Sequence, residues 1–319
     1  MRACRVCGNE RGNRAFQARE MMFGFRDAFE YTECAVCGCL QISEVPFELS
    51  KYYPAGYYSY GKVKEPGRIR RHAIRQRFLD ATGERHTWLG RLLARRYGTP
   101  PLADWARQLR LRSSDAVLDI GCGSGALLVE MNASGFTNLT GLDPFIEHDL
   151  EYRCGVRVLK RGLYDYKSTC DSAMMHHTFE HLVDPMGTME QLSGIVAPGG
   201  SVLIRMPVAG THAWRTYGAD WYQLDAPRHL FVHTEESLAI IARRAGFEIA
   251  GAVYDSTGRQ FWVSEQYRRD IPMNDERSYL RNPKGSVFTP EDIEKFDREA
   301  ERLNAERQGD QACFCLRKT

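Results

Sequence analysis

The sequence Ala-Val-Leu-Asp-Ile-Gly-Cys-Gly-Ser-Gly-Ala-Leu-Leu at residues 116–128 decides the fold. Its first five residues predict a short buried strand, and its last residues predict the start of an apolar helix. Between them, Gly121, Gly123 and Gly125 let the backbone approach a ligand closely and direct the amides of a helix N-terminus toward it. The stretch therefore predicts a strand, a ligand-binding loop and a helix in an α/β domain.

A second strand, predicted at 139–142, ends at Asp143, which lies 22 residues after Gly121. A carboxylate at this distance is placed to hold a ribose diol. This order of a strand, a glycine loop, a helix, a second strand and Asp143 predicts a nucleoside-binding unit. A nicotinamide cofactor is the alternative, but its fingerprint usually spaces the glycines as GxGxxG, whereas this loop has a glycine at every second position.

The segment 117–125, VLDIGCGSG, resembles the first motif of class I S-adenosylmethionine-dependent methyltransferases. Later segments resemble the fourth, fifth, sixth and last strands of that family in order, and these are 170–185, 197–204, 245–249 and 311–318. The likeness covers residues 113–319. It implies a Rossmann-like, seven-stranded α/β sheet with helices on both faces and the last strand inserted antiparallel. It also implies an enzyme that transfers methyl groups from S-adenosylmethionine.

The resemblance implies where this cofactor binds. Asp119, directly before the loop, matches an acid that the family places near the methionyl amine, which favours the methyl donor over a nicotinamide. Leu163 and Tyr164 are expected beside the adenine, and Cys122 is expected to pack under the loop rather than act as a nucleophile. The full expected set is Asp119, Gly121, Cys122, Gly123, Gly125, Asp143, Pro144, Leu163, Tyr164 and His176.

Methyl transfer requires a nucleophile aligned with the methyl group, and a hydroxyl or enolisable carbon also needs a base. Histidine suits this role because its pKa lies near neutrality. The segment 221–230, WYQLDAPRHL, concentrates aromatic, amide, acidic, basic and histidine side chains after the fifth strand, where the family often covers the acceptor. The catalytic candidates are His177, His181, Tyr222 and His229. A structural role for His229, and a capping or anchoring role for Glu180-His181, are the alternatives.

Two CxxC pairs, Cys4 with Cys7 and Cys34 with Cys37, lie near the start of the chain, and each is followed by glycine. Two such turns form a tetrahedral Cys₄ site, and a closed site of this kind holds structure rather than catalyses. Residues 1–50 are therefore expected to form a small zinc-ribbon-like module with a structural Zn²⁺. Four reduced cysteines without metal are the alternative, and Cys39 lies too close to Cys37 to be an easy ligand.

The connection between this module and the catalytic domain, residues 51–112, is unusual in charge and in tyrosine content. From Lys62 to Arg112 there are 14 lysines and arginines but four acids, although the whole chain carries only +2. Apolar spacing predicts helices at 68–79 and 88–97. The basic segment either faces an anionic acceptor or is a solvated surface. Five tyrosines between Tyr52 and Tyr60 either line a pocket or form a packed loop.

The 319 residues are 43% hydrophobic and 26% charged, which excludes global disorder. No apolar run approaches the ~20 residues needed to span a bilayer, and the N-terminal sequence lacks the apolar core of a secretory signal. We therefore expect a cytoplasmic protein, in which ten cysteines suit metal binding better than disulfides. The sequence predicts no oligomeric state.

The zinc module followed by the Tyr-rich segment resembles the subset of the family that acts on sugars and other small metabolites, including sugar C-methyltransferases. This resemblance implies methylation of a small-molecule acceptor, such as a sugar nucleotide or a glycan sugar, at oxygen or carbon. The longer sugar C-methyltransferases carry a further C-terminal domain, which sets this chain apart from them. The alternative is an RNA methyltransferase that grips phosphates with the zinc module and the basic helices. Against it, the fourth strand ends in HHTFEH rather than the pattern used on nucleobase amines.

Overall fold

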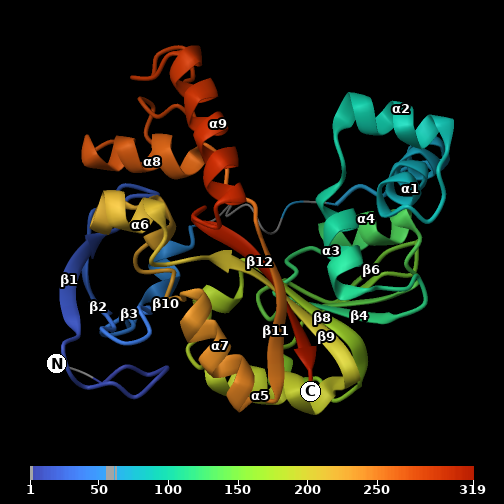
Figure 1. Cartoon of the computed structure of the whole chain (residues 1–319), viewed down its shortest axis with the longest axis horizontal. Coiled ribbons are helices and arrows are strands. Elements are labelled where there is room, and N and C mark those ends of the chain that lie inside the picture. Colours follow the sequence, from blue (N-terminus) through green and yellow to red (C-terminus); the bar gives the residue numbers. More distant parts are fainter. Residues whose placement is uncertain (1–2, 55–60, 62) are drawn as a thin grey trace.

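Two β-sheets organise the chain in the computed structural model, which describes residues 3–54, 61 and 63–319 (Figure 1). The strands of the larger sheet are β4 (Ala116–Ile120), β5 (Asn138–Leu142), β6 (Leu150–Glu151), β7 (Arg157–Leu159), β8 (Cys170–His176), β9 (Val196–Pro207), β11 (Phe247–Tyr254) and β12 (Gln311–Lys318). Those of the smaller sheet are β1 (Arg14–Arg19), β2 (Ala28–Glu33), β3 (Leu40–Ile42) and β10 (Phe231–Val232).

Helices connect these strands. The α-helices are α1 (Arg68–Thr82), α2 (Trp88–Tyr97), α3 (Pro101–Leu109), α4 (Ala126–Ser134), α5 (Pro185–Ile195), α6 (His212–Tyr217), α7 (Glu235–Arg244), α8 (Arg259–Arg268) and α9 (Pro290–Ala305). The 3₁₀ turns are η1 (Leu49–Tyr52), η3 (Leu163–Asp165), η4 (Phe179–His181), η5 (Gly218–Asp220) and η6 (Tyr222–Leu224). Within the described residues, we find no helix with the length and apolar character required to cross a membrane.

The larger sheet has the order β11-β12-β9-β8-β4-β5-β7-β6. Its central strands β9, β8, β4, β5 and β7 are parallel, and β12 is inserted antiparallel between β9 and β11. This arrangement confirms the sheet expected from the resemblance, including its antiparallel last strand. The two-residue strand β6 pairs antiparallel with β7 and adds an eighth, unexpected strand at the edge.

Helices cover both faces of the larger sheet, because its strands bury side chains alternately on each side. On β8, Ala173 and Met175 belong to the apolar cluster that includes residues of α5 and α7. Met174 between them belongs to the cluster formed with α3 and α4. Figure 1 shows these two pairs of helices on opposite sides of the strands. The parallel sheet therefore exposes only its strand ends, where ligands bind in open α/β sheets.

The smaller sheet is completed by a strand from the catalytic part of the chain. β10 pairs antiparallel with β3, so that Phe231 lies opposite Gln41 and Val232 lies opposite Leu40. The Arg5 guanidinium lies over the Phe231 ring, 4.2 Å from its centroid. The cysteine-bearing segment is thus fixed directly to the chain that follows His229.

The basic segment forms the two expected helices and one more. α1 and α2 occur where the sequence predicts them, and α1 continues to Thr82 before Gly83, in the left-handed region, ends it. The additional helix, α3, starts with Pro101 in its first turn and buries one apolar face against the sheet. α1 packs against α3 and α4. Of the predicted tyrosine-rich and basic segments, Tyr57, Tyr58, Tyr60 and Lys62 lie outside the described residues.

Candidate active site

The glycine loop between β4 and α4 adopts a left-handed conformation that favours glycine. Gly121, Gly123 and Gly125 have φ angles of 71°, 54° and 78°. A Cβ atom on Gly121 would lie 2.4 Å from Oγ1 of Thr178, and one on Gly125 would lie 2.6 Å from a methyl carbon of Val158. The loop therefore needs glycine both for its backbone turn and for close packing.

A cavity of about 990 Å³ opens above this loop. The loop, Asp119 and His176 form one wall, and residues of α1 and α2 form the opposite wall. Lys64, Arg70 and Arg77 also line the cavity, so the basic segment faces a ligand site. The volume lies at the upper end of the range for small-molecule and cofactor sites.

Asp119 is a buried carboxyl group on the wall of this first cavity. Burial, together with the negative charge of Asp143, raises the pKa of Asp119 to about 8. A cationic group in the cavity would offset that unfavourable environment. Asp119 therefore suits the methionyl amine of S-adenosylmethionine.

Asp143 lies beneath the loop rather than on the cavity wall. One carboxylate oxygen accepts a hydrogen bond from the Gly123 amide, and the other accepts one from the Phe145 amide, both over 2.9 Å. Cys122 packs against Gly141, as expected, and burial raises the pKa of its thiol. Asp143 thus holds the shape of the loop, whereas contact with a ribose stays a prediction.

The expected adenine-side residues do not come together on the cavity wall in the described part of the chain. Leu163 is buried, Tyr164 and Pro144 are exposed, and none of the three lines the first cavity. His176 does line it, with its ring 4.5 Å from the Trp105 ring. Burial lowers the pKa of His176 to about 3, and its Nε2 has no hydrogen-bond partner among the described residues.

A second cavity of about 300 Å³ brings all four catalytic candidates together. His177 follows β8, His181 ends η4, Tyr222 lies in η6 and His229 precedes β10. The wall also includes Met22, Arg259, Tyr267, Met273 and Gln311. Since His176 lines the first cavity and His177 the second, the end of β8 lies where the two cavities approach each other.

Both ring nitrogens of His177 have hydrogen-bond partners. The Arg205 guanidinium donates to Nε2 over 2.6 Å, so this nitrogen must accept. Nδ1 therefore carries the hydrogen and donates to Oε1 of Glu180, 3.3 Å away. Because its lone pair is already used by Arg205, His177 is a positioning residue and a poor candidate for the base.

His229 has the opposite arrangement. Its Nδ1–H donates to the carbonyl of Gln223 over 2.7 Å, which leaves the lone pair on Nε2. That nitrogen lies 3.8 Å from a carboxylate oxygen of Asp225 and 4.0 Å from Oε1 of Glu180. Burial and the neighbouring His181 lower the pKa of His229 to about 4, so the ring is neutral at neutral pH. His229 therefore presents an unprotonated nitrogen beside two carboxylates.

His181 lies against His229, with ring centroids 4.8 Å apart. Its Nδ1–H donates to the carbonyl of Arg228 over 2.9 Å, and the Tyr53 hydroxyl lies 3.2 Å from the same nitrogen. This bond to the Arg228 carbonyl connects η4 to the 221–230 segment, so it supports the anchoring role of His181. The second nitrogen of the ring is left over for the cavity.

Arg228 explains why the 221–230 segment is so polar although it is buried. Its guanidinium is 0% exposed and forms ion pairs with Asp225 over 2.6 Å and with Glu20 over 2.9 Å. Burial alone would raise the pKa of Asp225, but Arg228 outweighs it and lowers that pKa. Glu20 lies on the turn after β1 of the smaller sheet. The ion pairs therefore lock the catalytic segment onto the cysteine-bearing sheet.

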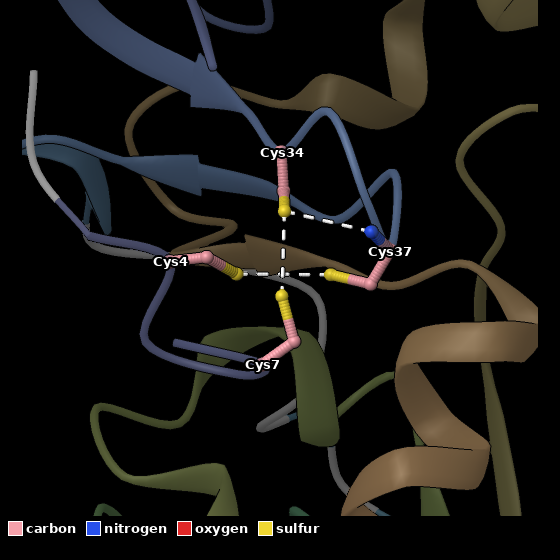
Figure 2. A group of neighbouring side chains, drawn as sticks. All are labelled: Cys4, Cys7, Cys34 and Cys37. Atoms are coloured by element: carbon pink, nitrogen blue, oxygen red, sulfur yellow. Dashed lines mark hydrogen bonds between the residues drawn. The ribbon is translucent and has the colours of Figure 1, made fainter. Parts of the chain in front are cut away.

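The four predicted cysteines converge on one point (Figure 2). The sulfurs of Cys4 and Cys37 lie 3.7 Å apart, and those of Cys7 and Cys34 lie 3.5 Å apart. Tetrahedral zinc with bonds of about 2.3 Å places its sulfur ligands about 3.8 Å apart. The donor set fits a closed metal site, and Cys39 is buried outside it.

Comparison with known proteins identifies the larger domain. Residues 93–251 match a family model described as a methyltransferase domain. A tRNA U34 carboxymethyltransferase from Methylococcus capsulatus is 24% identical over 168 residues, which cover 46% of this chain and 52% of the relative. A ubiquinone biosynthesis O-methyltransferase from Pectobacterium carotovorum is 30% identical over 131 residues, covering 35% of this chain and 52% of the relative. The chain thus spans about half the length of both relatives.

Among solved structures, a cyclopropane synthase from Mycobacterium tuberculosis is similar with a TM-score of 0.43 and 18% identity. The similarity covers 77% of this chain and 94% of that one. A mycolic acid cyclopropane synthase in complex with S-adenosylhomocysteine is similar with a TM-score of 0.46 and 17% identity. This similarity covers 77% of this chain and 94% of that one.

Proposed function

Because the chain carries a class I S-adenosylmethionine-dependent methyltransferase domain, we propose that it methylates a small, anionic acceptor in the second cavity. A sugar nucleotide or a glycan sugar, methylated at oxygen or carbon, is the acceptor class that we favour. The observation that carries the proposal is the unprotonated Nε2 of His229, beside Asp225 and Glu180. A buried base of this kind serves a nucleophile that must lose a proton.

The lining of the first cavity supports its use by S-adenosylmethionine. Asp119 would hold the methionyl amine, and the loop from Gly121 to Gly125 would lie along the methionyl part. When bound, the cofactor supplies an electrophilic sulfonium methyl group for displacement by the acceptor. The chain's own contribution is to bind, align and exclude water.

In the second cavity, His229 would remove the proton of the acceptor. Nε2 takes the proton while the Gln223 carbonyl keeps Nδ1–H in place. The imidazolium that forms lies beside the carboxylates of Asp225 and Glu180, which stabilise its charge. Burial raises the pKa of Tyr222 well above its usual value, so its phenol stays protonated and can donate to an acceptor oxygen.

An anionic acceptor is favoured by Arg259. Its guanidinium lines the second cavity and lies over the Trp262 ring, and it has no ion-pair partner among the described residues. A phosphate or carboxylate on the acceptor would pair with this guanidinium. A volume of about 300 Å³ suits a group of the size of one sugar.

We further propose that the four cysteines hold one structural Zn²⁺. Support comes from the sulfur spacing and from the burial of three of the four side chains. The ion would stabilise the smaller sheet, which has too few residues for a large core of its own. Through β10 and the Arg228 ion pairs, that sheet supports the segment that carries His229.

An RNA acceptor is the second candidate, and the surface of α1 and α2 favours it. Seven arginines on these helices are exposed, and they are Arg68, Arg70, Arg71, Arg75, Arg91, Arg95 and Arg96. One relative is named for tRNA and another for ubiquinone biosynthesis, so both acceptor classes occur among similar proteins. The small second cavity favours the first candidate.

The test is methyl transfer from methyl-labelled S-adenosylmethionine to two separate pools, one of sugar nucleotides and one of tRNA. We expect label in the sugar-nucleotide pool and loss of that label in His229→Ala. Label in tRNA alone would replace our acceptor with the second candidate. Label that is independent of His229 would refute the proposed base.

A further inference from the structure

Glu180, His181 and His229 form a cluster that the proposed base alone does not explain. One ligand atom from each lies within 4.8 Å of the others. Glu180 and His229 are buried, and His181 is half-buried at the wall of the second cavity. Metal bonds of about 2.1 Å place two ligand atoms at most about 4.2 Å apart. Small side-chain movements therefore suffice for all three to reach one ion.

Both histidines are oriented as metal ligands usually are. His181 donates Nδ1–H to the carbonyl of Arg228, and His229 donates Nδ1–H to the carbonyl of Gln223. Such backbone bonds fix the tautomer, orient the ring and leave the lone pair of Nε2 for a metal. The two carbonyls both belong to the 221–230 segment, which the Arg228 ion pairs hold rigid.

Glu180 supplies a buried carboxylate that is only half satisfied. Oε1 accepts from His177, whereas Oε2 has no hydrogen-bond partner among the described residues. The side chain is 1% exposed. A buried carboxylate beside the lone pair of a histidine creates a region of negative potential. A cation bound there would offset the cost of burying the carboxylate.

We propose that Glu180, His181 and His229 bind a divalent transition-metal ion such as Zn²⁺, at a site separate from the four cysteines, and that this ion inhibits methyl transfer. Two imidazoles and one carboxylate are a donor set for late first-row metals rather than for Mg²⁺ or Ca²⁺, which prefer oxygen. The ion occupies the lone pair of His229, so metal and acceptor proton compete for one nitrogen. The inhibitory effect rests on the proposed function, whereas binding of the ion does not.

Cobalt(II) is the probe for binding, and it is added to protein that already carries one equivalent of zinc. We expect one further equivalent to bind and to give visible d–d absorption without thiolate-to-cobalt charge transfer, since no sulfur belongs to this site. Glu180→Gln and His181→Asn should each weaken this binding at least about tenfold. His72→Asn, which changes an exposed histidine on α1, is the matched control and should leave it unaltered.

Turnover is measured in the same titration and should fall as the cobalt spectrum appears. Absence of a second equivalent, or equal binding in His181→Asn and Glu180→Gln, would overturn the proposal, as would turnover that rises with the metal. If Glu180→Gln does not fold, the cobalt affinity of His181→Asn, which changes a residue at the cavity wall, tests the proposal. The cobalt spectrum needs neither cofactor nor acceptor, so a failed acceptor screen does not affect it.

Discussion

Tyr31 donates its hydroxyl hydrogen to the backbone carbonyl of His229 over 2.8 Å, and this bond joins the cysteine-bearing sheet to the proposed base. Tyr31 lies on β2 and is completely buried. Together with β10 and the Glu20–Arg228 ion pair, it connects the small sheet to the 221–230 segment that lines the second cavity. The N-terminal part of the chain is therefore expected to affect catalysis without touching the cofactor.

The Tyr31→Phe variant tests this support, because it removes one hydroxyl and keeps the ring. A buried carbonyl without a partner should lower the free energy of unfolding by about 1–3 kcal/mol, measured in urea. Turnover should fall severalfold, while affinity for S-adenosylhomocysteine stays unchanged. Arg298→Gln, at an exposed site on α9 outside both cavities, is the control. Wild-type turnover in Tyr31→Phe would show that the contact does not position His229.

The carboxyl group of Asp119 should lower the free energy of unfolding at high pH and should strengthen cofactor binding. Its pKa is about 8 in the folded protein and about 4 in the unfolded chain, so its stabilising contribution is lost as pH rises from about 4 to 8. Without cofactor, Asp119→Asn should thus be about 2–5 kcal/mol more stable than wild type at pH 8, and nearly equal at pH 4. S-adenosylhomocysteine should bind the variant at least about tenfold more weakly. Equal affinity would remove Asp119 from the cofactor site.

Removal of zinc should damage the second cavity before the first. A strong chelator, or Cys34→Ser, should release one equivalent of zinc and loosen the smaller sheet, since the metal contributes directly to its folding. Turnover should then be lost, because β10 and Arg228 no longer hold the segment with His229. Binding of S-adenosylhomocysteine should persist, because the glycine loop lies on the larger sheet. Protein that contains no zinc when purified, yet is active, would contradict this account.

Arg259 should set the preference for an anionic acceptor. Arg259→Gln is expected to raise KM for the acceptor by about tenfold or more and to change kcat less, because a charge-assisted contact is lost while the base remains. The rise should be smaller at high salt, where the wild-type contact is itself weakened. Arg298→Gln on the exposed face of α9 is the control. An unchanged KM would assign recognition to other residues.

The sequence predicted the large sheet and the cysteine cluster because both depend on local patterns. The strand–glycine–helix spacing at 116–128 and the two CxxC turns each specify a backbone shape within a few residues. The third helix of the basic segment was missed, although Leu102, Ala106 and Leu109 repeat at helical spacing. The edge strand β6 has only two residues, too few to produce a readable pattern.

The candidate site was only partly predictable, because long-range packing builds it. The polar composition of 221–230 pointed to His229, but no local signal reveals that Met22 and Met273 share its cavity. Nor does spacing show that β10 would join β3, almost 190 residues earlier in the chain. The pairing of Arg205 with His177 likewise depends on neighbouring strands, so the sequence did not distinguish a positioning histidine from a base.

The most direct test of the whole account is the rate of methyl transfer by His229→Ala at saturating cofactor, once an acceptor has been found. General bases contribute about 10²–10⁴-fold to such rates. We predict a rate at least about 100-fold below wild type, with S-adenosylhomocysteine affinity unchanged, because His229 lines the second cavity and not the first. A rate close to that of wild type, or an equal loss of cofactor affinity, would contradict the assignment of two cavities to two tasks.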